Sequence, residues 1–367
     1  MQRATFATIL FFSAAFAAAA AGVDRAGMDT GVAPGDDFWA YANGGWVKTH
    51  PIPPDRSSYG TGALLSEEAN KRTVDLIQTA AKGAAAGSDA QKVGDYYASY
   101  MDEAAIEAKG TAPLAPVLAR IAAINDRASL TRVLGENMRA DVDAFNATDL
   151  YTDNIFGLWA QPAFDAPDVY APYLIQGGLG MPDRAYYLKD DAASMRVRAD
   201  YVSHMAAMLK LAGIADPEAK AARIMALETK IARAHASRED SDDVQKGNNP
   251  WTRADFAAKA PGMDWNAYFA AAGLGAPKRF VVWQPSAAIG ISKLVASEPI
   301  DVWKDYLTLR AIEHYANYLP KAFAAENFAF YGTVLSGTPQ IADRWKRAVS
   351  ATNAVLGEVV GKLYVAK

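Results

Sequence analysis

The sequence predicts a mainly α-helical protein, a large multi-helix domain with a small β-hairpin. Alanine is abundant and β-branched residues are sparse, which favours helix. Apolar residues recur at the spacing of an amphipathic helix along most of the chain. One block, residues 154–174, instead carries aromatic and branched side chains interrupted by three prolines. We interpret that block as the hairpin, because such runs bounded by turn residues are typical of strands.

The first residues form a segment that targets the protein for export. Residues 1–3 include a basic Arg3, residues 4–16 are apolar, and residues 17–21 are alanines that offer small-residue cleavage frames. This order is typical of a secretory signal peptide, so we predict a signal peptide over 1–21 and a mature domain over 22–367. The alternative is a membrane anchor through residues 4–21, whose apolar run is only marginally long enough to span a bilayer.

Composition excludes several classes of partner and supports an exported location. The chain has 367 residues, of which 51% are hydrophobic and 21% charged, with a net charge of −4. This balance gives no reason to expect nucleic acid as a partner, or stable membrane insertion after signal cleavage. Cysteine is absent, so core burial rather than disulfides must hold the fold. We expect a periplasmic or secreted protein.

After the leader, residues 22–62 are rich in turn chemistry. Residues 36–46 predict one short helix that ends at Gly44 and Gly45. The run 51–54 contains three prolines and is therefore extended or turned.

Capped, periodic segments then predict a series of helices. Ser66 is a candidate N-cap, Ser88 and Gln91 form a capping-box pattern, and Asp216 precedes a proline suited to a first helical turn. The predicted helices cover about residues 66–82, 88–101, 114–121, 129–138, 192–212 and 216–231. Two short helices begin at Thr252 and Asp264, and residues 280–283 form a short apolar strand candidate.

Two long helices close the chain, and the last runs to Lys367 without a C-cap signal. Its final residues are apolar, so we interpret the chain as cut inside a larger protein. One face of this helix is expected to lack cover here, and it carries Trp345, Val349, Leu356, Val360 and Leu363.

A catalytic centre is not visible in the sequence. The four histidines are His50, His204, His235 and His314, and no two of them are spaced i, i+4 as in a zinc-binding H-E-x-x-H helix. His314 lies on an apolar stripe, which predicts a hydrogen-bonded core histidine, and His235 is expected to contact Arg238 or Glu239 at a helix end. No catalytic residue and no metal ligand is therefore assigned, although a zinc site assembled from separate helices stays open.

Other patterns that carry chemistry also have structural explanations. Adjacent carboxylates, such as those at 239–240 and 242–243, predict solvated charge rather than an acid–base pair. Three glycines within 177–180 lack the strand and helix context of a dinucleotide site. They favour a tight turn, followed by Asp183 as a cap for the short helical segment at 186–188.

Several separated motifs carry a resemblance to a known family. Residues 36–53 read DDFWAYANGGWVKTHPIP, residues 177–188 read GGLGMPDRAYYL, residues 227–240 read LETKIARAHASRED, and residues 329–365 include FYGTVLSG and LGEVVGKLYV. In order and spacing they resemble the neprilysin-type zinc metallopeptidases, which include neprilysin, endothelin-converting enzyme and bacterial oligopeptidases. The resemblance extends over essentially the whole mature chain and identifies it as similar to the N-terminal domain of that family.

The resemblance implies a mostly helical domain that caps the active-site cavity of an exported zinc metalloendopeptidase and limits entry to short peptides. In the family, zinc is bound by a catalytic half that follows this region with H-E-x-x-H, E-x-x-x-D and N-A-x-[FY] motifs. This chain contains none of the three in that context, so we expect it to bind no zinc and to be inactive alone. Its implied partners are peptide substrates and the missing catalytic domain.

One departure limits what can be transferred about substrate binding. Mammalian members carry an Arg and an Asp near the substrate's C-terminal side, and the matching positions here are Ser58 and Ala63. Arg56 is a candidate source of nearby charge, so the predicted substrate-binding residues are Arg56, Ser58 and Tyr59. The missing cysteines indicate the bacterial branch. The alternative function is a non-catalytic, exported helical protein that binds peptides or a partner.

Overall fold

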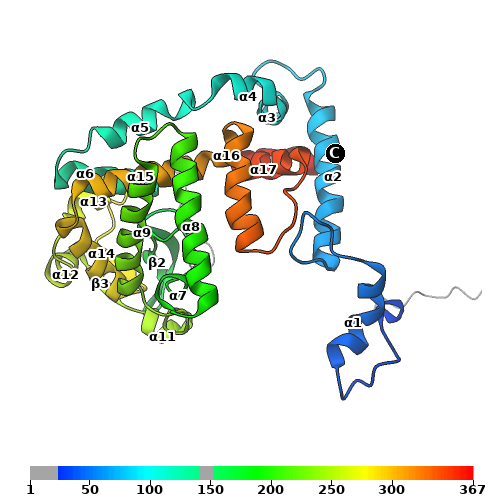
Figure 1. Ribbon diagram of the computed structural model, residues 1–367, viewed down its shortest axis with the longest axis horizontal. Coiled ribbons are helices and arrows are strands. Elements are labelled where there is room, and N and C mark those ends of the chain that lie inside the picture. The colour runs from blue at the N-terminus through cyan, green and yellow to red at the C-terminus, as the bar shows by residue number, and fades with distance from the viewer. Residues whose placement is uncertain (1–23, 141–151, 367) are drawn as a thin grey trace, which may run out of the picture. The chain divides into compact units, whose positions relative to one another are not determined.

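The computed structural model describes residues 24–140 and 152–366 (Figure 1). The predicted signal peptide lies outside the described residues. Contacts divide the chain into a smaller unit, residues up to 53 together with 58–62, and a larger unit, residues 54–57 and 63–367. Mainly helical structure with one small sheet confirms the predicted fold class. In the described residues, no helix is both long enough and apolar enough to cross a bilayer.

The smaller unit is built around the first motif. It contains η1 (Arg25–Gly27) and α1 (Phe38–Thr49), and the side chain of Asp37 caps α1. The predicted end of this helix at the glycine pair is wrong, because α1 runs through both glycines. A Cβ at Gly45 would lie 2.6 Å from the Met28 carbonyl oxygen, so the glycine serves a close backbone approach rather than a helix end.

The larger unit begins with helices that precede the sheet. They are α2 (Thr61–Ala81), α3 (Asp89–Met101), α4 (Glu103–Lys109), η2 (Ala112–Leu114), α5 (Ala115–Ala122) and α6 (Arg127–Met138). Ser88 caps α3 as predicted, with its hydroxyl accepting from the Gln91 amide at 3.2 Å. The predicted N-cap at Ser66 is wrong, because α2 starts five residues earlier, at Thr61.

The predicted hairpin is confirmed and belongs to a larger sheet than expected. The strands β1 (Phe156–Ala163) and β2 (Ala166–Gln176) pair antiparallel. Two short strands, β3 (Pro250–Thr252) and β4 (Arg279–Val282), complete the order β1-β2-β4-β3. Because alternate side chains face opposite sides, Leu174 joins the main core whereas Tyr173 packs on the other face with Val281.

Helices that follow the β1–β2 hairpin along the chain supply most of the main core. They are α7 (Ala185–Leu188), α8 (Ala192–Leu211), α9 (Pro217–Ala234), α10 (Arg238–Asp242), α11 (Val244–Gly247), α12 (Arg253–Lys259), α13 (Trp265–Ala271), α14 (Pro285–Ser297) and α15 (Ile300–Tyr315). In Figure 1, α8 and α9 run side by side, and these helices contact each other extensively. The main core contains fully buried aromatics such as Trp303 and Phe256.

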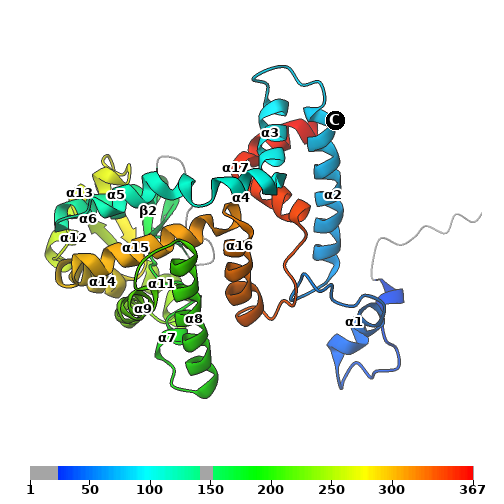
Figure 2. The same cartoon turned by 45° about the horizontal axis from the view of Figure 1, so that its top comes forward.

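The chain continues through η3 (Ala316–Tyr318), α16 (Lys321–Phe328), a π-helical segment η4 (Ala329–Val334) and α17 (Arg344–Val365). Figure 2 shows α17 next to α3 and α2, and a second hydrophobic cluster joins these three helices. The expectation that the predicted face of the last helix lacks cover is wrong for Val349 and Val360, whereas Trp345, Leu356 and Leu363 are only partly buried. Val349 is fully buried and Val360 is 6% exposed, because both pack in this cluster.

Candidate functional site

The second motif forms a turn, residues 177–188, which we call the motif turn. Its backbone leads from the end of β2 into α7, and the Asp183 side chain accepts a hydrogen bond from the Ala185 amide at 2.6 Å. The prediction of Asp183 as the cap is wrong in position, because the N-cap residue of α7 is Arg184. Gly180 has a strict steric role. A Cβ at this position would overlap the hydroxyl of Tyr201 and the guanidinium of Arg310, so a larger residue displaces one of them.

A group of buried polar side chains surrounds Gly180, and we call it the buried polar network. Its members are Tyr187 of α7, Tyr201 of α8, Glu228 of α9, and Arg310 and Glu313 of α15.

Glu228 is the acceptor at the centre of this network. It is fully buried, and it accepts from the Tyr187 hydroxyl at 2.6 Å and from the Gly180 amide at 3.2 Å. The Tyr201 hydroxyl donates to it at 3.3 Å and in turn accepts from Arg310 at 2.7 Å. One carboxylate thereby ties the motif turn to three helices.

Burial and pairing with neighbouring charges shift the pKa values of these groups in opposite directions. Burial raises the pKa of Glu228, and the Arg310 charge and the Tyr187 hydrogen bond offset this only in part. Burial also lowers the pKa of Arg310, but Glu313, Tyr201 and Glu228 outweigh it and the guanidinium stays charged. Because its members are engaged with one another inside the core, the network fixes the turn and does not present a reactive group to solvent.

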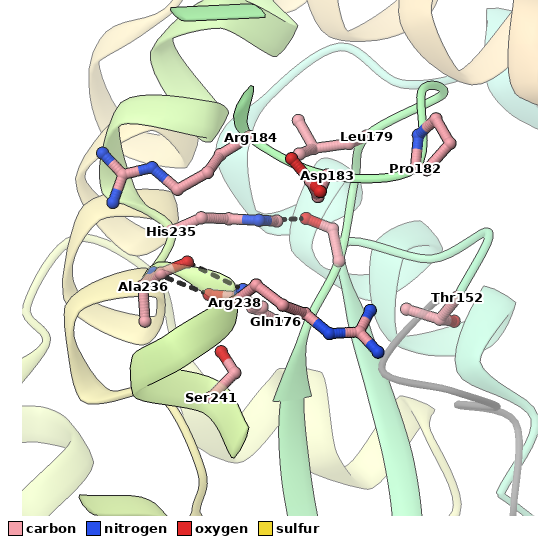
Figure 3. A pocket seen from close by; sticks show the side chains of 11 residues that line it. Thr152, Gln176, Leu179, Pro182, Asp183, Arg184, His235, Ala236, Arg238 and Ser241 are labelled. Atoms are coloured by element: carbon pink, nitrogen blue, oxygen red, sulfur yellow. Dashed lines mark hydrogen bonds between the residues drawn. The ribbon is translucent and has the colours of Figure 1, made fainter. Parts of the chain in front are cut away.

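A small pocket lies beside the motif turn (Figure 3). It has a volume of about 40 Å³, room for a few water molecules. The lining residues come from the segment before β1, the end of β2, the motif turn, the link between α9 and α10, and α10 itself. They are Thr152, Gln176, Gly177, Leu179, Pro182, Asp183, Arg184, His235, Ala236, Arg238 and Ser241.

His235 forms the inner wall of this pocket. Its Nε2 lies 2.9 Å from the Gly177 carbonyl oxygen, so Nε2 carries the proton and donates. Burial lowers the pKa of His235 to about 4, which keeps the ring neutral near pH 7. The expected contact with Arg238 or Glu239 is not the one formed, because the ring turns inward to the motif turn.

The pocket's other polar groups are also largely committed to the fold. Gln176 exchanges two hydrogen bonds with the Ala236 backbone, at 2.8 and 3.3 Å. Figure 3 shows Arg184 and Arg238 extending in different directions, so their guanidinium groups do not converge on one anion. The pocket has no nucleophile next to a base. Among the described residues, no three His, Cys, Asp or Glu side chains are placed to hold a metal ion.

The predicted substrate-binding residues fall in both units. Arg56 is in the larger unit, where its Nε donates to Glu67 at 3.0 Å. Ser58 and Tyr59 are in the smaller unit, where Ser58 is exposed and the Tyr59 ring packs 5.7 Å from the Trp46 ring. These contacts leave the proposed role of the three residues untested.

The structure corrects the prediction for His314 and adds two buried ionisable residues that the sequence analysis did not identify. His314 is not a core histidine, because its side chain is 55% exposed and its Nδ1 lies 3.1 Å from Asp153. Sequence reasoning also missed Glu228 and Arg310. The available signal was position: Glu228 stands between Ile224 and Ile231 on the apolar face of α9, where an ionisable residue needs a buried partner.

Comparisons with known proteins agree with this architecture. The model of peptidase family M13 matches residues 34–367. The crystal structure of a Mycobacterium tuberculosis zinc metalloprotease in complex with an inhibitor matches with a TM-score of 0.85 and 36% identity, over 94% of this chain and 52% of that chain. Endothelin-converting enzyme 1 of Rattus norvegicus is 26% identical over 92% of this chain and 44% of its own length.

PepO of Lactobacillus rhamnosis, at 19% identity and a TM-score of 0.73, shares the fold over 91% of this chain and 51% of its own. The chain thus spans about half the length of the relatives that it matches. The family model covers nearly all of the sequence that the structure describes, including the motif turn and the helices that supply the buried polar network. This chain belongs to peptidase family M13 and corresponds to its N-terminal, mainly helical domain.

Proposed function

We propose that this chain is the substrate-gating part of an exported zinc metalloendopeptidase that hydrolyses short peptides. The observation that carries the proposal is the family match over residues 34–367, combined with relatives of about twice this length. The described residues do not fit a catalytic zinc, which requires three protein ligands and an open position. In the proposal, the ligands and the zinc belong to a catalytic half like that of the relatives.

Peptides are the proposed substrates because the matched relatives are a zinc metalloprotease and an endothelin-converting enzyme. Arg56 is the proposed contact for a peptide's terminal carboxylate, with Ser58 and Tyr59 contributing hydroxyl groups. Arg56 uses its Nε on Glu67, and its side chain is 26% exposed. A guanidinium carries five N–H donors, so the terminal nitrogens of Arg56 can meet a carboxylate while the Glu67 contact persists.

Export is proposed from the leader-like residues 1–21. Protein isolated from the native host is expected to begin near Gly22, which N-terminal sequencing determines. An intact Met1 in the membrane fraction supports the anchor through residues 4–21 instead.

Metal analysis and a cleavage assay test the proposal that this chain alone neither binds zinc nor cleaves peptides. The purified chain, supplied with zinc and then dialysed, is expected to retain less than one zinc per molecule and to leave a quenched fluorescent peptide intact. Stoichiometric zinc, or cleavage that a chelator abolishes, contradicts the proposal that the chain is inactive alone.

The proposed substrate contact of Arg56 is tested in a protein that contains this chain together with a family catalytic half. Arg56→Ala is expected to raise KM for peptides with a free terminal carboxylate, and to change KM little for the amidated forms. Arg72→Ala is the matched control, because Arg72 forms an exposed i, i+4 ion pair with Glu68 on α2. Equal effects on the two peptide forms, or equal effects of the two variants, contradict the assignment of Arg56.

A further inference from the structure

His204 is a buried histidine that neither the motif turn nor the pocket uses. It lies on α8, and its side chain is 2% exposed. Its Nδ1 lies 3.1 Å from Glu326 of α16, and its Nε2 lies 3.4 Å from Glu313 of α15. One imidazole therefore stands between two carboxylates that belong to two other helices.

The chemistry of imidazole makes this arrangement dependent on a proton. A neutral ring has one N–H donor and one bare nitrogen, whereas an imidazolium donates from both nitrogens. Between Glu313 and Glu326, only the charged form attracts both carboxylates. Loss of the proton leaves a lone pair facing a carboxylate oxygen inside the core, where an unpaired charge is costly.

Aromatic side chains around the ring connect its ion pairs to a second segment. Phe330 stacks on it at 5.1 Å, and Tyr331 meets it edge-on at 5.5 Å, both from the π-helical segment η4. Since η4 continues directly from α16, the His204 contacts hold α16 and η4 against α8 together. π-Helical turns are rare and occur frequently at functional sites, which makes this segment a place to look for a conformational role.

Several other titratable or charged groups face His204 from the elements packed around it. They are Tyr201 of α8, whose ring stacks on the imidazole at 6.4 Å, Tyr331 of η4, and Arg310 of α15, which is linked to the ring through Glu313. Arg310 already neutralises Glu313 in part, at 2.5 Å, so Glu326 is the carboxylate that depends most on the imidazolium.

A cavity lies beside Glu313, although both oxygens of this carboxylate are themselves buried. A cavity of about 220 Å³ is lined by Asp153, Arg310, Glu313, His314, Asn327 and Tyr331. This volume admits several water molecules, and its lining is polar.

We propose that His204 is a proton-operated clamp, which holds α16 and η4 on α8 while its ring is charged and releases them when the ring loses its proton. The inference concerns the fold of this chain and does not depend on the proposed function.

Whether the clamp opens or closes as pH rises follows from the difference between the folded and unfolded pKa values of His204. Burial lowers the pKa of His204, but its contacts with Glu313 and Glu326 outweigh burial, and the net shift is upward from 6.5. A raised pKa in the folded state means that the clamp is fully closed below the unfolded value of about 6.5. Its contribution is lost as pH rises through the folded value, by about tenfold in the closing equilibrium for each pH unit that separates the two pKa values.

Hydrogen exchange of residues 321–334 in the full chain, measured from pH 6 to 9.5 and corrected for intrinsic exchange, tests the clamp. Wild type is expected to lose protection in this segment as pH rises, while α9 keeps its protection. His204→Gln is expected to give a protection that no longer changes with pH. His50→Gln is the matched control and is expected to retain the wild-type profile, because His50 lies in the smaller unit and is not part of the clamp.

Glu326→Gln provides a second test if His204→Gln does not fold. Removing one carboxylate is expected to move the loss of protection to lower pH. With only four histidines in the chain, the ring proton resonance of His204 can be followed by NMR and is expected to titrate above 6.5 in wild type. A flat wild-type profile, an unchanged profile in His204→Gln, or an unchanged midpoint in Glu326→Gln each overturns the proposal.

Discussion

The two motif-rich regions of this chain differ in how deeply their side chains and backbone are buried. The motif turn is enclosed, and its Gly180 amide donates to a carboxylate that is fully buried. Helix α1 has no buried residue, and Phe38 and Trp39 are 68% and 63% exposed. A dense pattern of glycines and aromatics therefore marks either an internal structural requirement or a surface rich in apolar side chains. We expect only the buried motif turn to control the stability of this chain.

The largest expected effect is at the centre of the buried polar network. Glu228→Ala leaves Arg310 with fewer partners and the Gly180 amide without its carboxylate, and removing one member of a buried charge pair costs about 3–5 kcal/mol. Chemical denaturation measures the change in the free energy of unfolding. Glu358→Ala is the control, because Glu358 is exposed on α17 and surface changes usually stay within about 0.5 kcal/mol. Similar losses of unfolding free energy in Glu228→Ala and Glu358→Ala would contradict the claim that the buried motif turn controls stability.

Acid is expected to weaken the motif turn through His235. Its folded pKa of about 4 lies below the ordinary value of 6.5, so its contribution is complete above 6.5 and is lost as pH falls toward 4. A shift of this size corresponds to about 3 kcal/mol. In His235→Gln this part of the pH dependence of Tm should vanish, whereas His50→Gln, in the smaller unit, should keep it. An unchanged acid slope in His235→Gln contradicts the buried neutral ring.

A smaller effect distinguishes the two faces of α17. Val349→Ala removes two methyl groups from the cluster shared with α2 and α3, which costs about 1.5–2.5 kcal/mol. Val355→Ala, on the same helix but 57% exposed, is expected to change the free energy of unfolding by less than about 0.5 kcal/mol. Equal effects would restore the sequence-based expectation that the Val349 face lacks cover.

The smallest expected effect is in the first motif. Trp39→Ala and Phe38→Ala should leave the free energy of unfolding of this chain within about 0.5 kcal/mol of wild type, because both side chains are largely exposed. Trp303→Ala is the contrast, since truncating a fully buried tryptophan costs about 3–5 kcal/mol. A loss near that size at Trp39 would show that α1 is part of a packed core.

Local signals in the sequence predicted much of the fold. The caps at Ser88, Thr252 and Asp264 and the proline-punctuated hairpin all lie where their chemistry indicates. Such features depend on residues that are neighbours along the chain, so they can be identified from a single sequence. The parallel pairing of β2 with β4 joins segments about a hundred residues apart, and no local pattern specifies it.

The candidate site was less predictable for the same reason. The glycines of the motif turn indicated a tight turn, but the reason for Gly180 is a hydroxyl on α8 and a guanidinium on α15. His314 and His235 were placed the wrong way round, because helical periodicity gives the face of a helix and not what packs against it. Ionisable residues on apolar stripes, such as Glu228, were the signal that the sequence did contain.

Native-state hydrogen exchange of individual amides tests most directly whether the motif turn is an internal requirement and α1 is not. The Gly180 and Met181 amides both donate to the Tyr187 hydroxyl, at 3.0 and 2.9 Å, inside the core. They are expected to exchange only through opening as costly as global unfolding, whereas the amides of α1 exchange through much cheaper local opening. Protection of the α1 amides equal to that of Gly180 and Met181 would contradict the account.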